Sequence, residues 1–157
     1  MKNHINIFIV EDNYIYANLL KRELSNFLPC EISIYTKGKD CLDNLYKIPD
    51  IIILDHNLGD MNGMEVFKEI REVNQEAPVI FLSGQKKMSV AVEALKHGAF
   101  DYLEKNEFAI RLIKEHVQKL VHYCNFLKQK HTYNRFKAGF FAAVLLYVVS
   151  ILYLYLI

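Results

Sequence analysis

The sequence predicts an α/β fold built on a parallel sheet of five strands. Short apolar runs alternate along the chain with amphipathic stretches of helical spacing. Two of the runs, 51–54 and 79–82, are apolar at every position, a pattern typical of strands covered on both faces of a parallel sheet. Five successive strand–helix units predict one doubly wound sheet with right-handed crossovers.

The elements are expected to follow one another in strict alternation. The predicted strands are 5–10, 31–35, 51–54, 79–82 and 100–103. The predicted helices are 13–28, 38–47, 63–75, 87–97 and 107–127. All three prolines stand one or two residues before a strand run, where a missing N–H group does least harm. Gly98 stands where a glycine commonly ends a helix.

Charge and cysteine content bear on the partner class and on the compartment of the protein. The chain of 157 residues has 19 basic and 18 acidic side chains and a net charge of +1. Because nucleic-acid binding normally needs a basic face, the charge gives that role no support. Three widely spaced cysteines without a C-x-x-C pair favour a reduced, cytosolic compartment.

Polar and charged side chains follow four of the five predicted strands. Glu11 and Asp12 follow the first strand, Asp55 the third, Ser83 the fourth and Lys105 the fifth. In doubly wound sheets the working site lies beyond the carboxyl ends of the strands. We therefore expect three carboxylates, one hydroxyl and one ammonium to meet there.

Such a cluster has a restricted chemistry. Three close carboxylates repel one another, so one would be partly protonated without a counter-charge. A hard divalent cation such as Mg²⁺ suits ligation by oxygen alone. Asp55 stands alone at a strand end and is the candidate nucleophile toward phosphorus. For any single acid, a solvated loop residue is the competing interpretation.

Four segments of the chain resemble the receiver domain of two-component response regulators, over about residues 3–125. These segments are I-F-I-V-E-D-N at 7–13, I-I-L-D-H-N-L-G-D-M-N-G-M-E at 52–65, V-I-F-L-S-G at 79–84 and A-L-K-H-G-A-F-D-Y-L-E-K at 94–105. The resemblance implies a flavodoxin-like sheet with the strand order 2-1-3-4-5.

The resemblance also implies a reaction. Asp55 would accept a phosphoryl group from the phosphohistidine of a sensor histidine kinase or a histidine phosphotransfer protein, and Lys105 and Ser83 would each bind a phosphoryl oxygen. The domain would then catalyse its own phosphorylation and dephosphorylation while acting mainly as a signalling switch. The implied Mg²⁺ ligands are Glu11, Asp12, Asp55 and the backbone carbonyl of Asn57.

Three further residues receive roles by the same resemblance. The backbone N–H groups of His56 and Gly84 would contact the phosphate, and we expect the His56 side chain to point to solvent. Tyr102 matches the aromatic switch residue that moves inward when Ser83 moves toward the phosphate.

Two positions depart from the family pattern. In the family, the lysine is usually followed by a proline, and the peptide bond between the two is cis. Here Asn106 follows Lys105. A non-proline cis bond costs about 3 kcal/mol, so either that strain is retained or Lys105 lies on a different loop path. Gly59 stands where the family usually has a second proline.

A helical apolar pattern continues beyond the predicted sheet domain. Its positions are 110, 113, 117, 120, 124 and 127, and the first half would pack on the sheet. The second half has nothing to cover, which would suit a short coiled-coil seam and a homodimer.

The run 138–157 is predicted to cross a membrane. It holds no Asp, Glu, Lys or Arg, and 18 of its 20 residues are apolar. Twenty helical residues span about 30 Å, the thickness of the hydrocarbon core. Basic residues precede the run, which places the receiver on the cytoplasmic side.

The expected organisation is thus a receiver domain at 1–125, a basic juxtamembrane connector at 126–137 and a transmembrane helix at 138–157. No separate output domain is expected. Two other functions remain open: a non-phosphorylated pseudo-receiver that acts as a membrane-bound protein-binding module, and a haloacid-dehalogenase-type phosphatase. The second usually needs another Asp two residues after the nucleophile, where this chain has Asn57.

Overall fold

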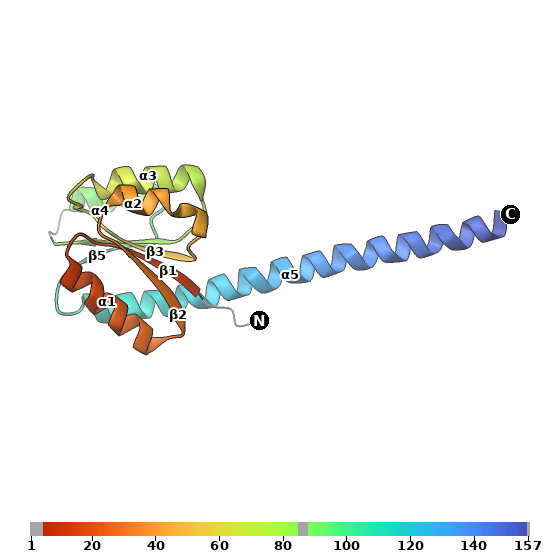
Figure 1. Ribbon diagram of the computed structural model, residues 1–157, viewed down its shortest axis with the longest axis horizontal. Helices are drawn as coiled ribbons and strands as arrows, with labels where there is room; N and C mark the ends of the chain where they lie inside the picture. The colour runs from red at the N-terminus through yellow and green to blue at the C-terminus, as the bar shows by residue number, and fades with distance from the viewer. Residues whose placement is uncertain (1–4, 85–87, 157) are drawn as a thin grey trace. The chain divides into compact units, whose positions relative to one another are not determined.

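A computed structural model describes residues 5–84 and 88–156 (Figure 1). Side chains are described throughout these ranges except at 127–132, 134–135, 138, 142 and 147–156. The chain divides into two compact units, Met1–Val121 and His122–Ile157.

The first unit alternates strands and helices in the predicted order (Figure 1). The strands are β1 (Ile5–Val10), β2 (Cys30–Tyr35), β3 (Ile51–Asp55), β4 (Val79–Ser83) and β5 (Asp101–Glu104). The helices are α1 (Tyr14–Phe27), α2 (Gly38–Asp43), the 3₁₀ helix η1 (Leu45–Lys47), α3 (Gly63–Val73), α4 (Met88–Lys96) and α5 (Ala109–Leu156).

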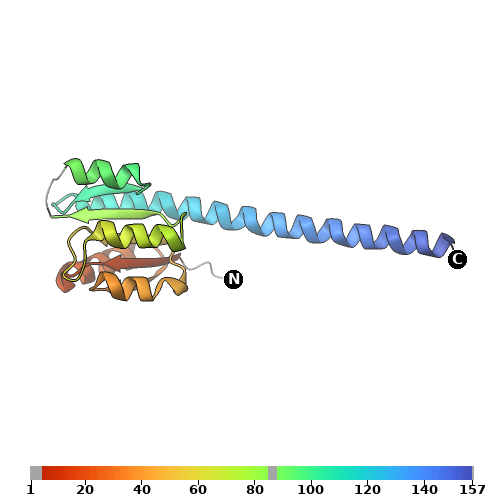
Figure 2. The ribbon, with the colours of Figure 1, turned by 90° about the horizontal axis from the view of Figure 1, so that it is seen from above.

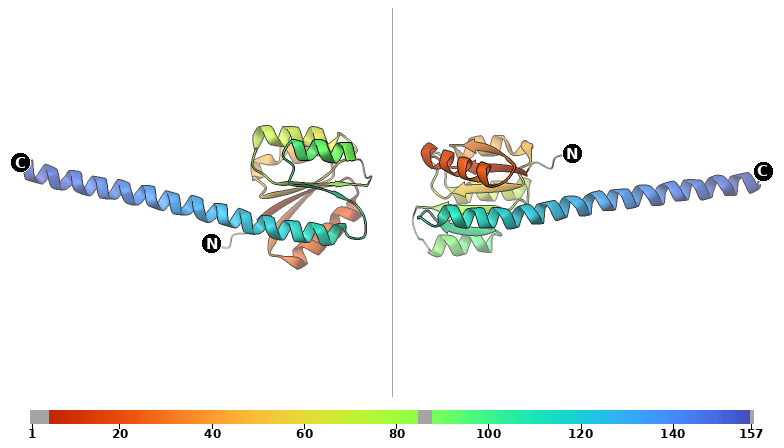
Figure 3. Two further views of the ribbon diagram at one scale, coloured as in Figure 1. Left: turned by 180° about the vertical axis from the view of Figure 1, so that it is seen from behind. Right: turned by 90° about the horizontal axis from the view of Figure 1, so that it is seen from below.

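The five strands form one parallel sheet in the order β2-β1-β3-β4-β5, which confirms the predicted topology. Helices α2, α3 and α4 cover one face of the sheet, and Figure 2 views them from above. Helix α1 and residues 109–121 of α5 cover the other face (Figure 3). This arrangement buries every residue of β3 and β4, as the apolar runs 51–54 and 79–82 predict.

Aromatic side chains form part of one buried core cluster. Phe67 and Phe81 pack edge to face with ring centroids 5.3 Å apart, and Phe8 and Tyr35 do the same at 4.8 Å. On the other face, the α5 residues at 113, 117 and 120 are almost fully buried, as predicted for the part that covers the sheet. The predicted homodimer stays a prediction.

Three helix boundaries differ from or refine the sequence prediction. The predicted helix 38–47 is two elements, α2 and η1, and η1 ends at Lys47 with Ile48 as its C-cap residue at φ +50°. Pro49 follows, and a proline disfavours the helical conformation in the residue before it. Helix α4 ends as predicted, with Gly98 at φ +88°. Helix α5 continues without interruption to residue 156, so the predicted connector at 126–137 is helical.

Within the part of the chain that the structure describes, no helix combines the length and the apolar character that a membrane crossing requires. The predicted transmembrane helix at 138–157 is therefore not supported by the structure. Its side chains at 138, 142 and 147–157 lie outside the described residues.

Candidate functional site

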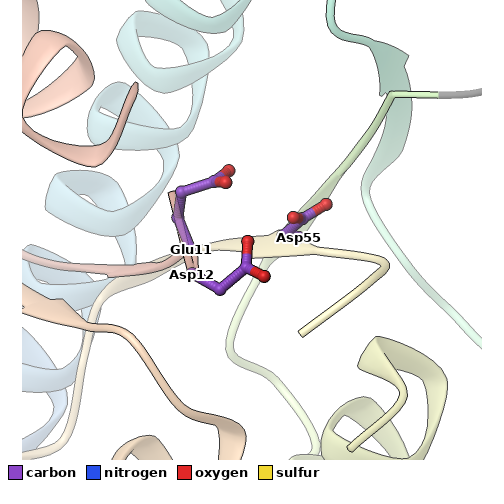
Figure 4. A group of neighbouring side chains, drawn as sticks. All are labelled: Glu11, Asp12 and Asp55. Atoms are coloured by element: carbon purple, nitrogen blue, oxygen red, sulfur yellow. The ribbon is translucent and has the colours of Figure 1, made fainter. Parts of the chain in front are cut away.

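Three carboxylates lie beside one another at the carboxyl edge of the sheet (Figure 4). Strands β1 and β3 are neighbours in which Val10 pairs with Leu54, so the residues that follow them are brought together. Glu11, Asp12 and Asp55, here called the acidic cluster, each offer one oxygen within 4.8 Å of the others. Glu11 and Asp55 are buried, whereas Asp12 is exposed. The predicted convergence of these three residues is confirmed.

Lys105 lies between two of the carboxylates. Its Nζ is 2.8 Å from Asp55 Oδ2 and 2.7 Å from Glu11 Oε2. The Lys105 backbone N–H donates to the carbonyl of Ser83 at 2.8 Å, which holds the residue against the end of β4. Lys105, which was predicted to join the cluster from the end of the fifth strand, therefore contacts the acidic cluster directly.

With Asn106 in place of the usual proline, the Lys105 side chain still contacts the acidic cluster. The described residues contain no cis peptide bond, so of the two alternatives the loop takes the trans path. The Asn106 side chain accepts a hydrogen bond from the N–H of Phe108 at 2.9 Å, and its carbonyl accepts one from Ala109 at 3.1 Å. Asn106 thus satisfies backbone donors at the start of α5.

The electrostatics of the pocket favour a cation. Burial raises the pKa of Glu11, and the charge of Asp55 raises it further, against the lowering effect of the Lys105 hydrogen bond. Burial alone would lower the pKa of Lys105, but its hydrogen bonds to Asp55 and Glu11 outweigh burial and raise it. The lysine therefore stays an ammonium, and among the described residues one positive charge contacts the group of three carboxylates.

The acidic cluster fits Mg²⁺ by its donor chemistry. All its ligands are carboxylate oxygens, which hard divalent cations prefer. A divalent ion would also relieve the repulsion that raises the pKa of Glu11. The fourth predicted ligand comes from Asn57, two residues beyond Asp55, in a loop where Asn57 forms a bridge with Asn62.

Gly63 sets the path of the chain around Asp55, and the sequence reasoning missed it. A Cβ atom at Gly63 would overlap the backbone oxygen of Asp55 and lie 2.9 Å from the Cα of His56. The Gly63 N–H donates to the carbonyl of His56 at 2.9 Å, so α3 begins in contact with the end of β3. The capping box of Asn62 and Glu65 was the sequence signal for this helix start.

Asp60 fixes the other side of this loop, also unforeseen from the sequence. Its two carboxylate oxygens accept from the N–H groups of Gly38 (2.9 Å) and Lys39 (3.0 Å), at the start of α2. Burial would raise its pKa, but the backbone N–H donors together outweigh burial and lower the pKa. The loop that follows Asp55 is therefore tied to the helix beside it.

The structure corrects the prediction for His56. Its side chain is buried, with 6% of the residue exposed, and does not point to solvent. Its backbone N–H donates to the carbonyl of Leu82 at 2.8 Å, in the sheet rather than toward a phosphate. The reason is that the hydrogen bonding between β3 and β4 continues one residue past Asp55.

Ser83, Gly84 and Tyr102 occupy neighbouring positions. Ser83 is fully buried at the end of β4, one residue beyond the Leu82 that pairs with Asp55. Gly84 is exposed, and a Cβ atom there would meet nothing within 4 Å. Tyr102 stacks on Phe81 with centroids 6.2 Å apart, and its buried hydroxyl has no hydrogen-bond partner among the described residues. Their predicted roles in phosphate binding and switching stay predictions.

Tyr16 is a further residue of the site that the sequence reasoning did not select. The Lys105 Nζ lies 5.2 Å from the centroid of the Tyr16 ring. Tyr16 lies in the first turn of α1, three residues after the N-cap residue Asn13, and no pattern in the sequence singles it out.

Comparisons with known proteins agree with this site. Residues 7–118 match the family model described as the response regulator receiver domain. The luminescence regulatory protein LuxO of Vibrio campbellii is 37% identical over 105 residues, which are 66% of this chain and 23% of that protein. Because the chain spans less than a quarter of this relative, the expected absence of an output domain is not supported.

Solved structures of response regulators are also similar to this chain. The signal receiver domain of a LuxO repressor protein from Vibrio parahaemolyticus has a TM-score of 0.73 and 28% identity, over 80% of this chain and 95% of that one. The phosphorylated cyanobacterial phytochrome response regulator RcpA has a TM-score of 0.66 and 26% identity, over 71% of this chain and 90% of that one. With the strand order, the acidic cluster and the placement of Lys105, these matches show that the chain belongs to the receiver domains of two-component response regulators.

Proposed function

We propose that Asp55 accepts a phosphoryl group from a phosphohistidine and that the resulting aspartyl phosphate is the signalling state. The observation that carries the proposal is the position of Lys105, whose Nζ lies 2.8 Å from the buried carboxylate of Asp55. A buried acid with a fixed ammonium at its side is held ready to attack phosphorus and to have the incoming charge neutralised.

Each group in the pocket has a defined part in the transfer. An oxygen of Asp55 forms a bond to phosphorus while the P–N bond of the phosphohistidine breaks and the imidazole leaves with the electron pair. Lys105 neutralises one phosphoryl oxygen, and the Ser83 hydroxyl and the Gly84 N–H donate to others. Because the His56 N–H is bonded within the sheet, Gly84 is the backbone donor we assign to the phosphate.

Mg²⁺ would be held by the acidic cluster and the backbone carbonyl of Asn57, and would supply charge neutralisation for the reacting oxygens. In its absence the described residues place one ammonium, that of Lys105, against the three carboxylates. We therefore expect both phosphorylation and dephosphorylation to require the ion.

Phosphorylation would act on the fold through charge. Replacing a carboxylate by an acyl phosphate changes about −1 to about −2 and draws in mobile donors. Ser83 lies at the end of β4 beside this charge, and Tyr102 stacks on the same strand with a buried hydroxyl that has no partner in the described part of the chain. We propose that these two residues move together and form the switch.

The donor we propose is a sensor histidine kinase or a histidine phosphotransfer protein. Receiver domains of response regulators typically interact with such proteins, and this chain belongs to that family. The similarity to a receiver described as phosphorylated supports the same reaction here.

Incubation of the full chain with Mg²⁺ and acetyl phosphate tests the reaction. We expect a base-labile phosphoryl adduct in the wild type, no adduct in Asp55→Asn, and none when EDTA removes the metal. Lys105→Met should react far more slowly while it remains folded. An equal adduct in Asp55→Asn would refute the proposal.

The pseudo-receiver remains the rival. It would bind its partner equally well whatever the state of Asp55. If Asp55 is phosphorylated, the affinity for the partner protein should therefore differ between the phosphorylated wild type and Asp55→Asn. Equal affinities would favour the pseudo-receiver.

We also propose that residues 138–157 attach the protein to a membrane, with the receiver on the cytoplasmic side. The support is the run of 20 residues without a charge, preceded by Lys128, Lys130, Arg135 and Lys137. Deletion of 138–157 should move the protein from the membrane fraction to the supernatant after cell lysis. A full-length protein that already fractionates with the supernatant would contradict the proposal.

A further inference from the structure

A closed cycle of contacts links Lys105, Glu11, Asn13 and Tyr16. The Asn13 backbone N–H donates to Glu11 Oε1 at 3.3 Å, and the Asn13 side chain accepts from the Tyr16 N–H at 3.1 Å. The Tyr16 ring faces the Lys105 Nζ at 5.2 Å from its centroid, and that Nζ donates to Glu11 Oε1 at 2.9 Å. The position of the lysine amine is thus linked to the start of α1.

The aromatic ring of Tyr16 makes the contact with the Lys105 amine. An aromatic face attracts an ammonium, and the attraction is stronger where water is partly excluded. Lys105 has 19% of its side chain exposed, so the tyrosine ring lies against an amine that is already largely desolvated. The Tyr16 hydroxyl is buried and has no hydrogen-bond partner among the described residues.

We propose that Tyr16 is a positioning residue: its ring holds the Lys105 amine against Asp55 for phosphoryl transfer. This inference rests on the proposed function of Asp55. Without the ring, the lysine side chain would have more rotamers open to it, and Nζ would less often face the oxygen that forms the bond to phosphorus.

The rate of phosphorylation tests the role of the ring. With acetyl phosphate the bond from Asp55 to phosphorus forms while the donor's P–O bond breaks and acetate leaves. At saturating Mg²⁺, the rate constant for the full chain with Tyr16→Leu should fall about three- to tenfold, the range for one partly desolvated cation–π contact. The Mg²⁺ concentration for half-maximal rate should not change, because Tyr16 is no ligand.

The conservative variant and a matched control separate positioning from folding. Tyr16→Phe keeps the ring and should recover the rate to within about twofold. Tyr14→Leu removes an exposed tyrosine from the same helical turn and should leave the rate as in the wild type. A Tyr16→Phe variant as slow as Tyr16→Leu would overturn the inference in favour of the hydroxyl, and an unchanged Tyr16→Leu would overturn it outright.

A double-mutant cycle in unfolding free energy tests the contact independently of phosphoryl transfer. Tyr16→Leu should destabilise the wild type more than it destabilises Lys105→Met, in which the amine is absent. Equal effects in both backgrounds would overturn the inference. If the wild type takes no phosphoryl group, the proposed function of Asp55 fails, and the cycle still decides whether Tyr16 holds Lys105.

Discussion

Gly63 occupies the closest approach between α3 and the end of β3, where a side chain would overlap the backbone oxygen of Asp55. We expect Gly63→Ala to lower the free energy of unfolding by about 1–3 kcal/mol, the usual cost of overpacking. Because the strain falls on Asp55 and His56, phosphorylation should slow as well. Urea denaturation and the acetyl phosphate reaction measure the two effects.

Gly59 is the matched control in the same loop. A Cβ atom there meets nothing within 4 Å, and Gly59 is not among the residues with positive φ. Gly59→Ala should be neutral or stabilise the fold by up to about 1 kcal/mol. If Gly63→Ala is as stable as Gly59→Ala, the close contact is not a constraint on this site.

Glu11 should make the stability of the metal-free protein depend on pH. Burial and the charge of Asp55 raise its pKa in the folded state above 4.5. The folded protein therefore holds this proton more tightly than the unfolded chain does. Its contribution to stability is present below pH 4.5 and is lost as the pH rises through the raised value.

Unfolding of the wild type and Glu11→Gln across this pH range, in EDTA, measures the effect. The wild type should lose stability relative to Glu11→Gln as the pH rises from about 4.5, and Mg²⁺ should reverse the loss by binding the folded state. A difference between the two proteins that is constant with pH would contradict the assignment.

Asn106 contributes to the start of one element, helix α5, because its side chain accepts from the N–H of Phe108, the residue before that helix. Asn106→Ala should destabilise the protein by about 1 kcal/mol, the usual cost of losing such a cap. Asn106→Asp keeps an oxygen acceptor at the same place and should lose much less. Thermal unfolding of the two variants compares them, and equal losses would show that the side chain does not cap this helix.

The elements were predictable where local pattern decides them. Residues 51–54 of β3 and 79–82 of β4 are apolar at every position, a pattern typical of strands covered on both faces, and the two strands were predicted to within one residue. The region 38–47 was predicted less well. Its division into α2 and η1 depends on Asp60, from a distant loop, which caps α2, and on the turn at Ile48 before Pro49.

At the scale of the whole molecule, the sheet topology explains which site residues the sequence could reveal. Glu11, Asp55 and Lys105 follow strand ends, and the order β2-β1-β3-β4-β5 brings strand ends together. Tyr16 and Gly63 act through contacts between elements, which no local pattern encodes. The burial of His56 likewise follows from hydrogen bonding between β3 and β4, not from its polar character.

The most direct test of the account is the location of the phosphoryl group by mass spectrometry. The full chain is incubated with acetyl phosphate, with and without Mg²⁺, and then digested. We predict one phosphoryl group, on Asp55, which forms only when Mg²⁺ is present. Asp55→Asn should carry none. A phosphoryl group on another residue, or none on the folded wild type with Mg²⁺ present, would contradict this prediction.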